Sequence, residues 1–264
     1  MIEWGNAADN FGDAVRAYHL RRGTASSTAL KTTIQINGVL VPRRAALLID
    51  LLRELSDVRS LEGLRILEAG SGFGALAWYL ANEMRGAEVV GIDTNHELVR
   101  LAREAAGAAN PGSERTTFLN MDMTSLPTSW NASFDLVVAN NSLLYLPSRV
   151  RQRKALAAFF RVLKNDGVAI LYQANRWQYR EPFTRSPLIH LLPPTVRPTI
   201  SKLTGWRHDD SRVLLTSHRQ LERAMRGAGF SSTAAGTLNG GRPTRQRFGR
   251  YIVVAGRKAD HRVR

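Results

Sequence analysis

The fold of this 264-residue chain is decided by the stretch Ile66-Leu67-Glu68-Ala69-Gly70-Ser71-Gly72-Phe73-Gly74. A short apolar run ends in an acid, three glycines alternate after it, and an apolar helical segment, residues 75–85, follows at once. Glycine lacks a Cβ, so such a turn can adopt positive φ and bring its backbone close to a ligand. The free N–H groups at the start of the helix face the same ligand. The stretch therefore predicts a strand, a nucleotide-binding turn and a helix.

Downstream of the turn, strand-like apolar runs alternate with helical segments. We expect strands at residues 87–93, 116–120, 134–139 and 168–172, and helices at residues 94–108 and 148–163. This alternation predicts an α/β fold with a doubly wound, mostly parallel sheet and right-handed crossovers. Ligands of such sheets bind at the carboxyl ends of the strands.

Polar side chains stand at four of these predicted strand ends: Glu68, Asp93, Asp122 and Asn140. Each acid alone has an ordinary interpretation as a turn residue or a helix cap. Three acids at the ends of three consecutive strands are better explained by one shared ligand, because the carboxyl ends of parallel strands meet at one edge of the sheet. Asp135, by contrast, begins its strand at the opposite edge and is expected to be structural.

The segments that flank this alternating core are predicted to cover it. Before it we expect a helix over residues 10–20, a basic Ser/Thr-rich loop over 21–33 and a helix that opens at Pro42. Residues 174–215 are too long and too rich in proline for an ordinary connection, and are interpreted as a cap. Thr94-x-x-Glu97 and Ser217-x-x-Gln220 both predict capping boxes. Strands near residues 230–238 and 250–255 end the pattern.

Composition excludes several classes of site. The chain has no cysteine, which excludes disulfides, thiolate metal sites and cysteine nucleophiles. No apolar run reaches the roughly 18 residues of a membrane span, and the first residues lack a signal-peptide pattern, so we expect a cytoplasmic protein with no membrane partner. The net charge of +15 suits an anionic partner. The basic residues are nevertheless mostly arginines spread along the chain, which favours a compositional bias of the genome.

The motifs, in this order and spacing, resemble those of class I S-adenosylmethionine-dependent methyltransferases over roughly residues 61–173. The resemblance implies S-adenosylmethionine as the cofactor and a seven-stranded sheet whose last strand is antiparallel. By the same resemblance, the glycine turn wraps the methionine part of the cofactor, Asp93 binds both ribose hydroxyls and Asp122 meets the adenine amino group. The cofactor-binding residues it implies are Glu68, Gly70, Ser71, Gly72, Gly74, Asp93, Thr94, Asp122, Met123 and Asn140.

The main alternative for the turn is a nicotinamide-dinucleotide site, because Gly70-x-Gly72-x-x-Ala75 also fits that fingerprint. Such enzymes usually carry the fingerprint near the start of the chain, and their pattern requires neither Asp122 nor the strand from Phe134. We therefore expect one methyltransferase domain over residues 1–264. Its parts are an N-terminal helical cover (1–60), a cofactor-binding core (61–173), a cap insert (174–215) and a C-terminal helix with the last two strands (216–257).

The sequence says less about the molecule that accepts the methyl group. No Asn-Pro-Pro-Tyr tetrad follows the fourth strand, where Asn140-Asn-Ser-Leu143 stands instead, which argues against adenine-N6 and glutamine acceptors. The candidates for a general base or acceptor contact are His190, His19 and Tyr145. For both histidines a buried structural role competes with a catalytic one and is favoured. No cluster of His, Asp and Glu has metal-ligand spacing, so no metal is expected.

The sequence thus predicts methyl transfer to oxygen or nitrogen of a small molecule. The cap insert loosely resembles caps of bacterial small-molecule methyltransferases. RNA as the acceptor is the first alternative, supported by the arginines, and a cofactor-binding protein without turnover is the second. The identity of the acceptor and the oligomeric state stay open.

Overall fold

The computed structural model describes residues 4–23, 27–55, 62–82, 88–112, 114–178, 191–193, 195–196, 199–200, 203, 213–239, 242–244, 246 and 248–259. The helices of these ranges discussed below are α1 (Trp4–Arg21), α2 (Ser27–Asn37), α3 (Val41–Leu55), α4 (Ala75–Asn82), α5 (His96–Ala109), α6 (Arg149–Val162), α8 (His218–Gly227) and the short 3₁₀ turn η2 (Leu143–Tyr145). The strands are β1 (Arg65–Ala69), β2 (Glu88–Asp93), β3 (Thr116–Asn120), β4 (Phe134–Asn140), β5 (Leu163–Ala174), β6 (Ser231–Asn239), β7 (Arg242–Thr244) and β8 (Tyr251–Arg257).

One mixed sheet organises the fold, with the strand order β3-β2-β1-β4-β5-β8-β6-β7. Strands β1 to β5 pair in parallel, and β8 lies antiparallel between β5 and β6. The predicted doubly wound, seven-stranded, mostly parallel sheet is confirmed, and β7 adds a three-residue edge strand against β6. Strand β1 pairs with both β2 and β4, so the order in which the strands are added to the sheet reverses at β1. The ligand site of a doubly wound sheet is expected at that point.

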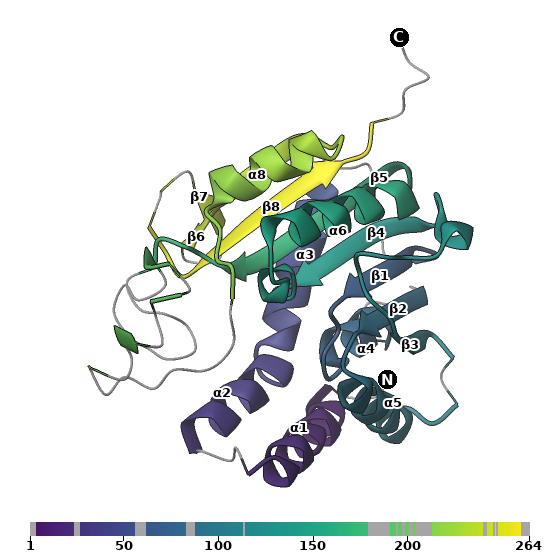
Figure 1. Ribbon diagram of the computed structural model, residues 1–264. Helices are drawn as coiled ribbons and strands as arrows, with labels where there is room; N and C mark the ends of the chain where they lie inside the picture. The colour runs from purple at the N-terminus through teal and green to yellow at the C-terminus, as the bar shows by residue number, and fades with distance from the viewer. Residues whose placement is uncertain are drawn as a thin grey trace.

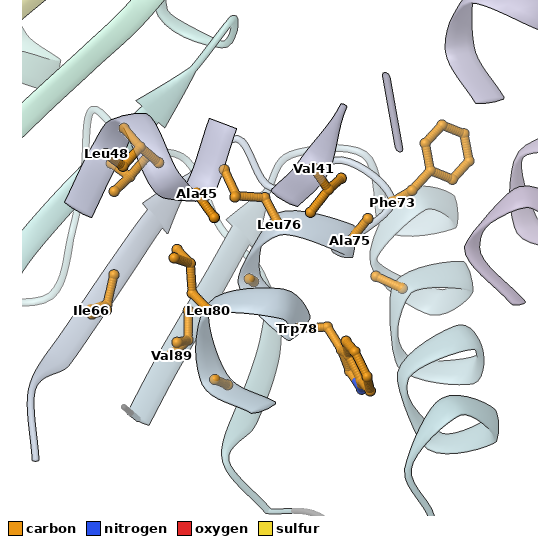
Figure 2. Packing of buried hydrophobic residues seen from close by; sticks show 14 of the residues in the cluster. Val41, Ala45, Leu48, Ile66, Phe73, Ala75, Leu76, Trp78, Leu80 and Val89 are labelled. Carbon is orange, nitrogen blue, oxygen red and sulfur yellow. The ribbon is translucent and has the colours of Figure 1, made fainter. Parts of the chain in front are cut away.

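Alternating side chains of the strands build two cores. Ile66 packs into the core that α1, α3, α4 and α5 cover, and the next residue, Leu67, packs into the core under α6 and α8. Figure 1 shows α6 and α8 on one face of the sheet and α3 on the other. In Figure 2, Leu76 of α4 lies near α3 while Leu80 points toward β1 and β2. A period of two along each strand therefore fills both faces.

The N-terminal prediction is partly wrong. The helix expected over residues 10–20 is confirmed as the longer α1, and Pro42 opens α3 as expected. The loop expected over residues 21–33 is instead largely replaced by α2. Leu30 and Ile34, one helical turn apart, pack against the core of the α3 face. Their burial outweighs the weak helix propensity of the Ser/Thr-rich segment, because packing and not propensity supplies most helix stability.

Of the helices predicted to start at Thr94, Ser148 and Ser217, the last two begin as expected. Ser148 caps α6, and Ser217 with Gln220 forms a complete capping box on α8. The capping box at Thr94 is wrong, because Asn95 is the N-cap of α5 and its side chain accepts from the N–H groups of Glu97 and Leu98. Most of the predicted cap insert, including residues 179–190 and 204–212, lies outside the described residues.

Candidate functional site

The glycine turn after β1 is fixed by backbone hydrogen bonds. The N–H groups of Gly70 and Ser71 both donate to the carbonyl oxygen of Ile92 on β2, at 2.8 and 2.9 Å. Gly70 has φ +80°, and a Cβ there would lie 2.2 Å from Cβ of Ser142. Gly74 has φ +81°, and its Cβ would lie 2.6 Å from the ring of Phe118. The turn needs glycine at both positions, for conformation and for space.

Asp93 joins the turn to the start of α5. Its Oδ2 accepts from the N–H of Gly72 at 3.0 Å, and its Oδ1 accepts from the N–H of Asn95 at 2.9 Å. The carboxylate keeps further lone pairs, and a pair of vicinal hydroxyls is a ligand that such a group can accept from. Thr94, the next residue, is exposed beside it.

Glu68 is the most perturbed acid of this edge. Its side chain is 2% exposed, and within the described residues its Oε2 has no hydrogen-bond partner. Burial raises the pKa of Glu68 to about 8, the N–H of Ala77 opposes that rise, Asp93 adds to it and Arg44 opposes it. Two other buried polar atoms at this edge, Oγ of Ser71 and Oδ1 of Asn140, have no partner in the described part of the chain either.

Asp122 and Met123 complete the edge beyond β3. Partial burial raises the pKa of Asp122, but the N–H and hydroxyl of Thr124 and the guanidinium of Arg151 outweigh this, so the pKa lies below its ordinary value. The N–H of Thr124 donates to Oδ1 at 2.8 Å, and Arg151 forms an ion pair with Oδ2. Cε of Met123 lies 3.4 Å from the place of a Cβ on Gly70, so Met123 contacts the glycine turn.

The acceptor candidates are placed less completely. Tyr145 ends η2, directly after β4, and is 52% exposed. His19 is half-buried on α1, with its ring 5.6 Å from the ring of Tyr18 in an edge contact. Tyr18 in turn meets Phe73 of the glycine turn, with ring centroids 5.5 Å apart. His190 lies outside the described residues, so its predicted role stays a prediction.

A buried polar cluster under α3 was not predicted from the sequence. Arg44 is 7% exposed, its guanidinium carbon lies 5.7 Å from the ring centroid of Tyr172, and its Nη1 donates to the carbonyl of Ile36 at 3.3 Å. Tyr172 stacks on Tyr251 at 5.0 Å, and burial raises the pKa of Tyr172, so its hydroxyl stays protonated. The signal was present, since Arg44 interrupts the apolar helical stripe that contains Val41 and Leu48.

The described residues contain neither a membrane span nor a metal-binding cluster. No helix among the described residues is long and apolar enough to cross a membrane. Three or more His, Asp or Glu side chains in an arrangement that could hold a metal ion are not found in the described ranges either.

Comparison with known proteins agrees with this geometry. Residues 66–167 match the family described as "Methyltransferase domain". The S-adenosyl-L-methionine-dependent Diels-Alderase iccD of Talaromyces variabilis is 38% identical over 125 residues, which are 47% of this chain and 41% of that protein. The erythromycin 3''-O-methyltransferase of Saccharopolyspora erythraea is 30% identical over 139 residues, 52% of this chain and 44% of that protein. The chain thus spans less than half the length of these curated relatives.

Among solved structures, the CcbJ methyltransferase from Streptomyces caelestis superposes with a TM-score of 0.61 at 19% identity, over 83% of this chain and 90% of that one. Sheet order, glycine turn and strand-end acids together define a doubly wound nucleotide-binding domain. Residues 66–167 thus match a methyltransferase domain, and the fold of the chain is that of solved S-adenosylmethionine-dependent methyltransferases.

The residues present fit the cofactor of that family, S-adenosylmethionine. The cofactor carries a sulfonium cation and an ammonium group, and the buried, unpartnered Oε2 of Glu68 is an acceptor for cationic donors at this edge. The carboxylates of Asp93 and Asp122 suit hydroxyl and amino donors. Of the predicted residues, Thr94 is the least supported, because its exposed side chain takes no part in the hydrogen bonds of the turn.

Proposed function

We propose that this protein transfers a methyl group from S-adenosylmethionine to an oxygen or nitrogen atom of a small-molecule acceptor. The observation that carries the proposal is the hydrogen bond from Gly72 N–H to Asp93 Oδ2. It holds the glycine turn and the second strand-end acid in one rigid edge, with Glu68 buried beside them. Preorganised acceptors at one edge bind a cationic nucleoside without reordering the protein.

In this proposal the chain binds and orients, and the cofactor, when bound, supplies an activated methyl group. Glu68 and the turn hold the methionine part, Asp93 the ribose and Asp122 the adenine amino group. Tyr18 on α1 covers the turn through its contact with Phe73, which excludes water from the site. A neutral acceptor must lose a proton, and His19, Tyr145 and His190 are the candidates for accepting it.

The small-molecule acceptor is supported by two observations. The name of one relative describes a 3''-O-methyltransferase acting on erythromycin. The polar atoms under α3, from Arg44, Tyr172 and Tyr251, lie on the same face of the sheet as Glu68 and are covered by a helix. A covered polar cluster suits an enclosed acceptor better than a nucleic-acid backbone, which requires an open basic surface.

The proposal that the protein binds S-adenosylmethionine is tested by calorimetry with this cofactor on the wild type, Asp93→Asn and Asp135→Asn. Asp93→Asn is expected to weaken binding by about 1–3 kcal/mol, because hydroxyl donors lose a charged acceptor. Asp135 is the matched control, since it is also a strand acid, but at the opposite edge, where it pairs with Lys164 at 2.8 Å. Asp135→Asn is expected to lower stability and leave the affinity unchanged. Strong NADH binding without S-adenosylmethionine binding would refute the assignment.

The acceptor half is tested by transfer of a labelled methyl group. Purified protein and labelled S-adenosylmethionine are incubated with the small-molecule, RNA and protein fractions of a cell extract. Label is expected in the small-molecule fraction. Label in RNA that competing small acceptors do not reduce would establish the RNA alternative instead.

A second candidate function follows from the relative iccD, which is named as an S-adenosyl-L-methionine-dependent Diels-Alderase. A protein of this fold that binds the cofactor and catalyses a cyclisation would consume no methyl group. Measuring S-adenosylhomocysteine separates the two functions, because methyl transfer releases one equivalent per turnover and a cyclisation releases none.

A further inference from the structure

A hollow lies between α6 and α8, away from the cofactor edge, which is the edge of the sheet that carries Glu68, Asp93 and the glycine turn. It has a volume of about 550 Å³ and is lined along both helices from Arg149 to Ala157 and from Gln220 to Ala228. Figure 1 shows these two helices side by side on the face of the sheet opposite α3. Eight residue steps of each helix correspond to about 12 Å, or a little over two turns. The groove has the length of a short helical contact.

The floor of the groove is apolar and built from small residues. Leu156 and Leu221 are buried there, and Ala157, Ala224 and Gly227 line it without filling it. A Cβ added to Gly227 would meet no atom within 4 Å. On each helix the lining residues recur at steps of three and four, which is the spacing of a face that packs against another helix. Small residues along such a face let a further helix backbone approach closely.

The walls of the groove carry arginines without acidic partners. No described acidic residue pairs with Arg149, Arg153 or Arg223, and α6 contains no acidic residue at all. Two other arginines of the same helices are neutralised, since Arg151 pairs with Asp122 and Arg226 with Glu222. The unpaired charges thus face the groove on both sides of an apolar floor.

Arg149 is held in place for this role. Its Nη1 donates to Oε1 of Gln152 at 2.8 Å, and its Nη2 donates to the carbonyl oxygen of Leu215 at 3.0 Å. Burial and the neighbouring Arg176 lower the pKa of Arg149, but a guanidinium stays charged in a protein. A half-buried cation without a carboxylate is electrostatically incomplete, so an anionic group that reaches it gains more than it would from an exposed arginine.

We infer that the α6–α8 groove is a docking site for an acidic amphipathic helix of a partner protein. The apolar face of that helix packs on Leu156 and Leu221, and carboxylates on its flanks pair with Arg149 and Arg153 on one wall and Arg223 on the other. Arg149 and Arg153 are four residues apart, so carboxylates four residues apart on the partner meet both. This site is separate from the proposed methyl-transfer site and does not depend on it.

A nucleic acid fits the groove less well. Phosphate contacts need cations, which the walls supply, but a polyanionic backbone gains nothing from the apolar leucine and alanine side chains of the floor. A helix uses both the floor and the walls. The two occupants therefore respond differently when the floor is filled and the charges are kept.

The test uses the full-length protein and a fluorescent synthetic peptide of about 15 residues, long enough to form a helix. The peptide has leucine and alanine on one face and glutamates on both flanks. A scrambled peptide keeps the composition but loses the face. Gly227→Leu fills the floor, and Gly107→Leu is the matched control, because Gly107 on α5 also has nothing within 4 Å of an added Cβ. Arg153→Ala with Arg223→Ala removes the charges, and Lys31→Ala with Arg115→Ala is the control for lost charge.

The expected result is that the amphipathic peptide binds at least about ten-fold more tightly than the scrambled one, with affinity falling as salt rises. Gly227→Leu and the Arg153/Arg223 pair are expected to lower the affinity by about ten-fold or more, and both controls to leave it unchanged. Equal binding of the two peptides, or no effect of Gly227→Leu, would overturn the proposal. So would single-stranded RNA that binds more tightly than the peptide and loses affinity with the Arg153/Arg223 pair but not with Gly227→Leu. Self-association that Gly227→Leu abolishes would assign the groove to a second copy of this chain.

Discussion

The cofactor edge and the N-terminal cover are built by different physics. At the edge, parallel strands place Glu68, Asp93 and the glycine turn through backbone hydrogen bonds of fixed geometry. The cover of α1 to α3 is held mainly by side-chain packing, with the rings of Trp4 and Phe11 against Trp78 of α4. The edge can therefore be predicted from short sequence motifs. The cover depends on which side chains, far apart in the sequence, come into contact.

The largest effect is expected in the cover. Phe11 is fully buried between Trp4 and Trp78, so Phe11→Ala should lower the free energy of unfolding by about 3–5 kcal/mol. Phe248→Ala is the matched control, because Phe248 is 66% exposed. Urea denaturation followed by circular dichroism measures both. If Phe11→Ala left the main unfolding transition unchanged, the cover would be a separately folding flap and the comparison would fail.

At the edge, the expected loss separates two glycines of one turn. Gly70→Ala combines a left-handed φ with a Cβ 2.2 Å from Ser142, and should cost about 2–5 kcal/mol. Gly72→Ala has φ +55° but meets no atom within 4 Å, and should cost only about 1–2 kcal/mol. The same denaturation experiment gives both values. Equal losses would mean that conformation alone, and not contact with Ser142, fixes the turn.

The sequence was sufficient for the edge because its residues act locally. Glu68 and Asp93 lie at the ends of β1 and β2, Asp122 follows the end of β3, and the register of the parallel strands brings these ends to one edge. Thr94 shows the limit of this reasoning. The sequence predicts Thr94 as the N-cap of the helix, but the N-cap of α5 is the next residue, Asn95. The rules of capping identify the residue types but not the exact start.

The cover could not be predicted in the same way. The segment over residues 21–33 has loop-like composition, and α2 forms because Leu30 and Ile34 find the core of a face built by distant elements. Arg44 could be recognised as a charge within an apolar stripe, but its neighbours Tyr172 and Tyr251 lie more than a hundred residues away. The groove between α6 and α8 also depends on tertiary packing, so no local sequence pattern predicts it.

The raised pKa of Glu68 at this edge predicts that the stability of the protein depends on pH. Its pKa rises to about 8 on folding from an ordinary value of 4.5, so the folded protein binds more protons between these values. Stability should therefore fall as pH rises from about 4.5 to 8, by at most about 1.4 kcal/mol per pH unit. Glu68→Gln should remove this slope, and Glu114→Gln, at an exposed position, should keep it. Urea denaturation across this pH range measures the slope.

Cofactor binding should show the opposite trend. A cationic ligand favours the carboxylate of Glu68, so binding near pH 7 should release a proton and the affinity should rise with pH up to about 8. Calorimetry in two buffers of different ionisation enthalpy counts the released proton. A binding reaction without proton release would place the cationic groups away from Glu68.

The smallest effect is expected where cover and edge meet, at Tyr18. Nδ2 of Asn95 lies 3.4 Å from the Tyr18 hydroxyl, a long hydrogen bond, while the ring meets Phe73 and lies under the guanidinium of Arg22 at 4.7 Å. Tyr18→Phe keeps both ring contacts and should weaken cofactor binding by no more than about 0.5–1 kcal/mol. Tyr18→Ala loses the rings and should weaken it more. Calorimetry gives the affinities, and hydrogen exchange of residues 4–21 shows whether α1 gains protection with cofactor. Equal losses for the two variants would mean that the hydroxyl, not packing, joins the cover to the edge; no loss and no gained protection would remove α1 from the site.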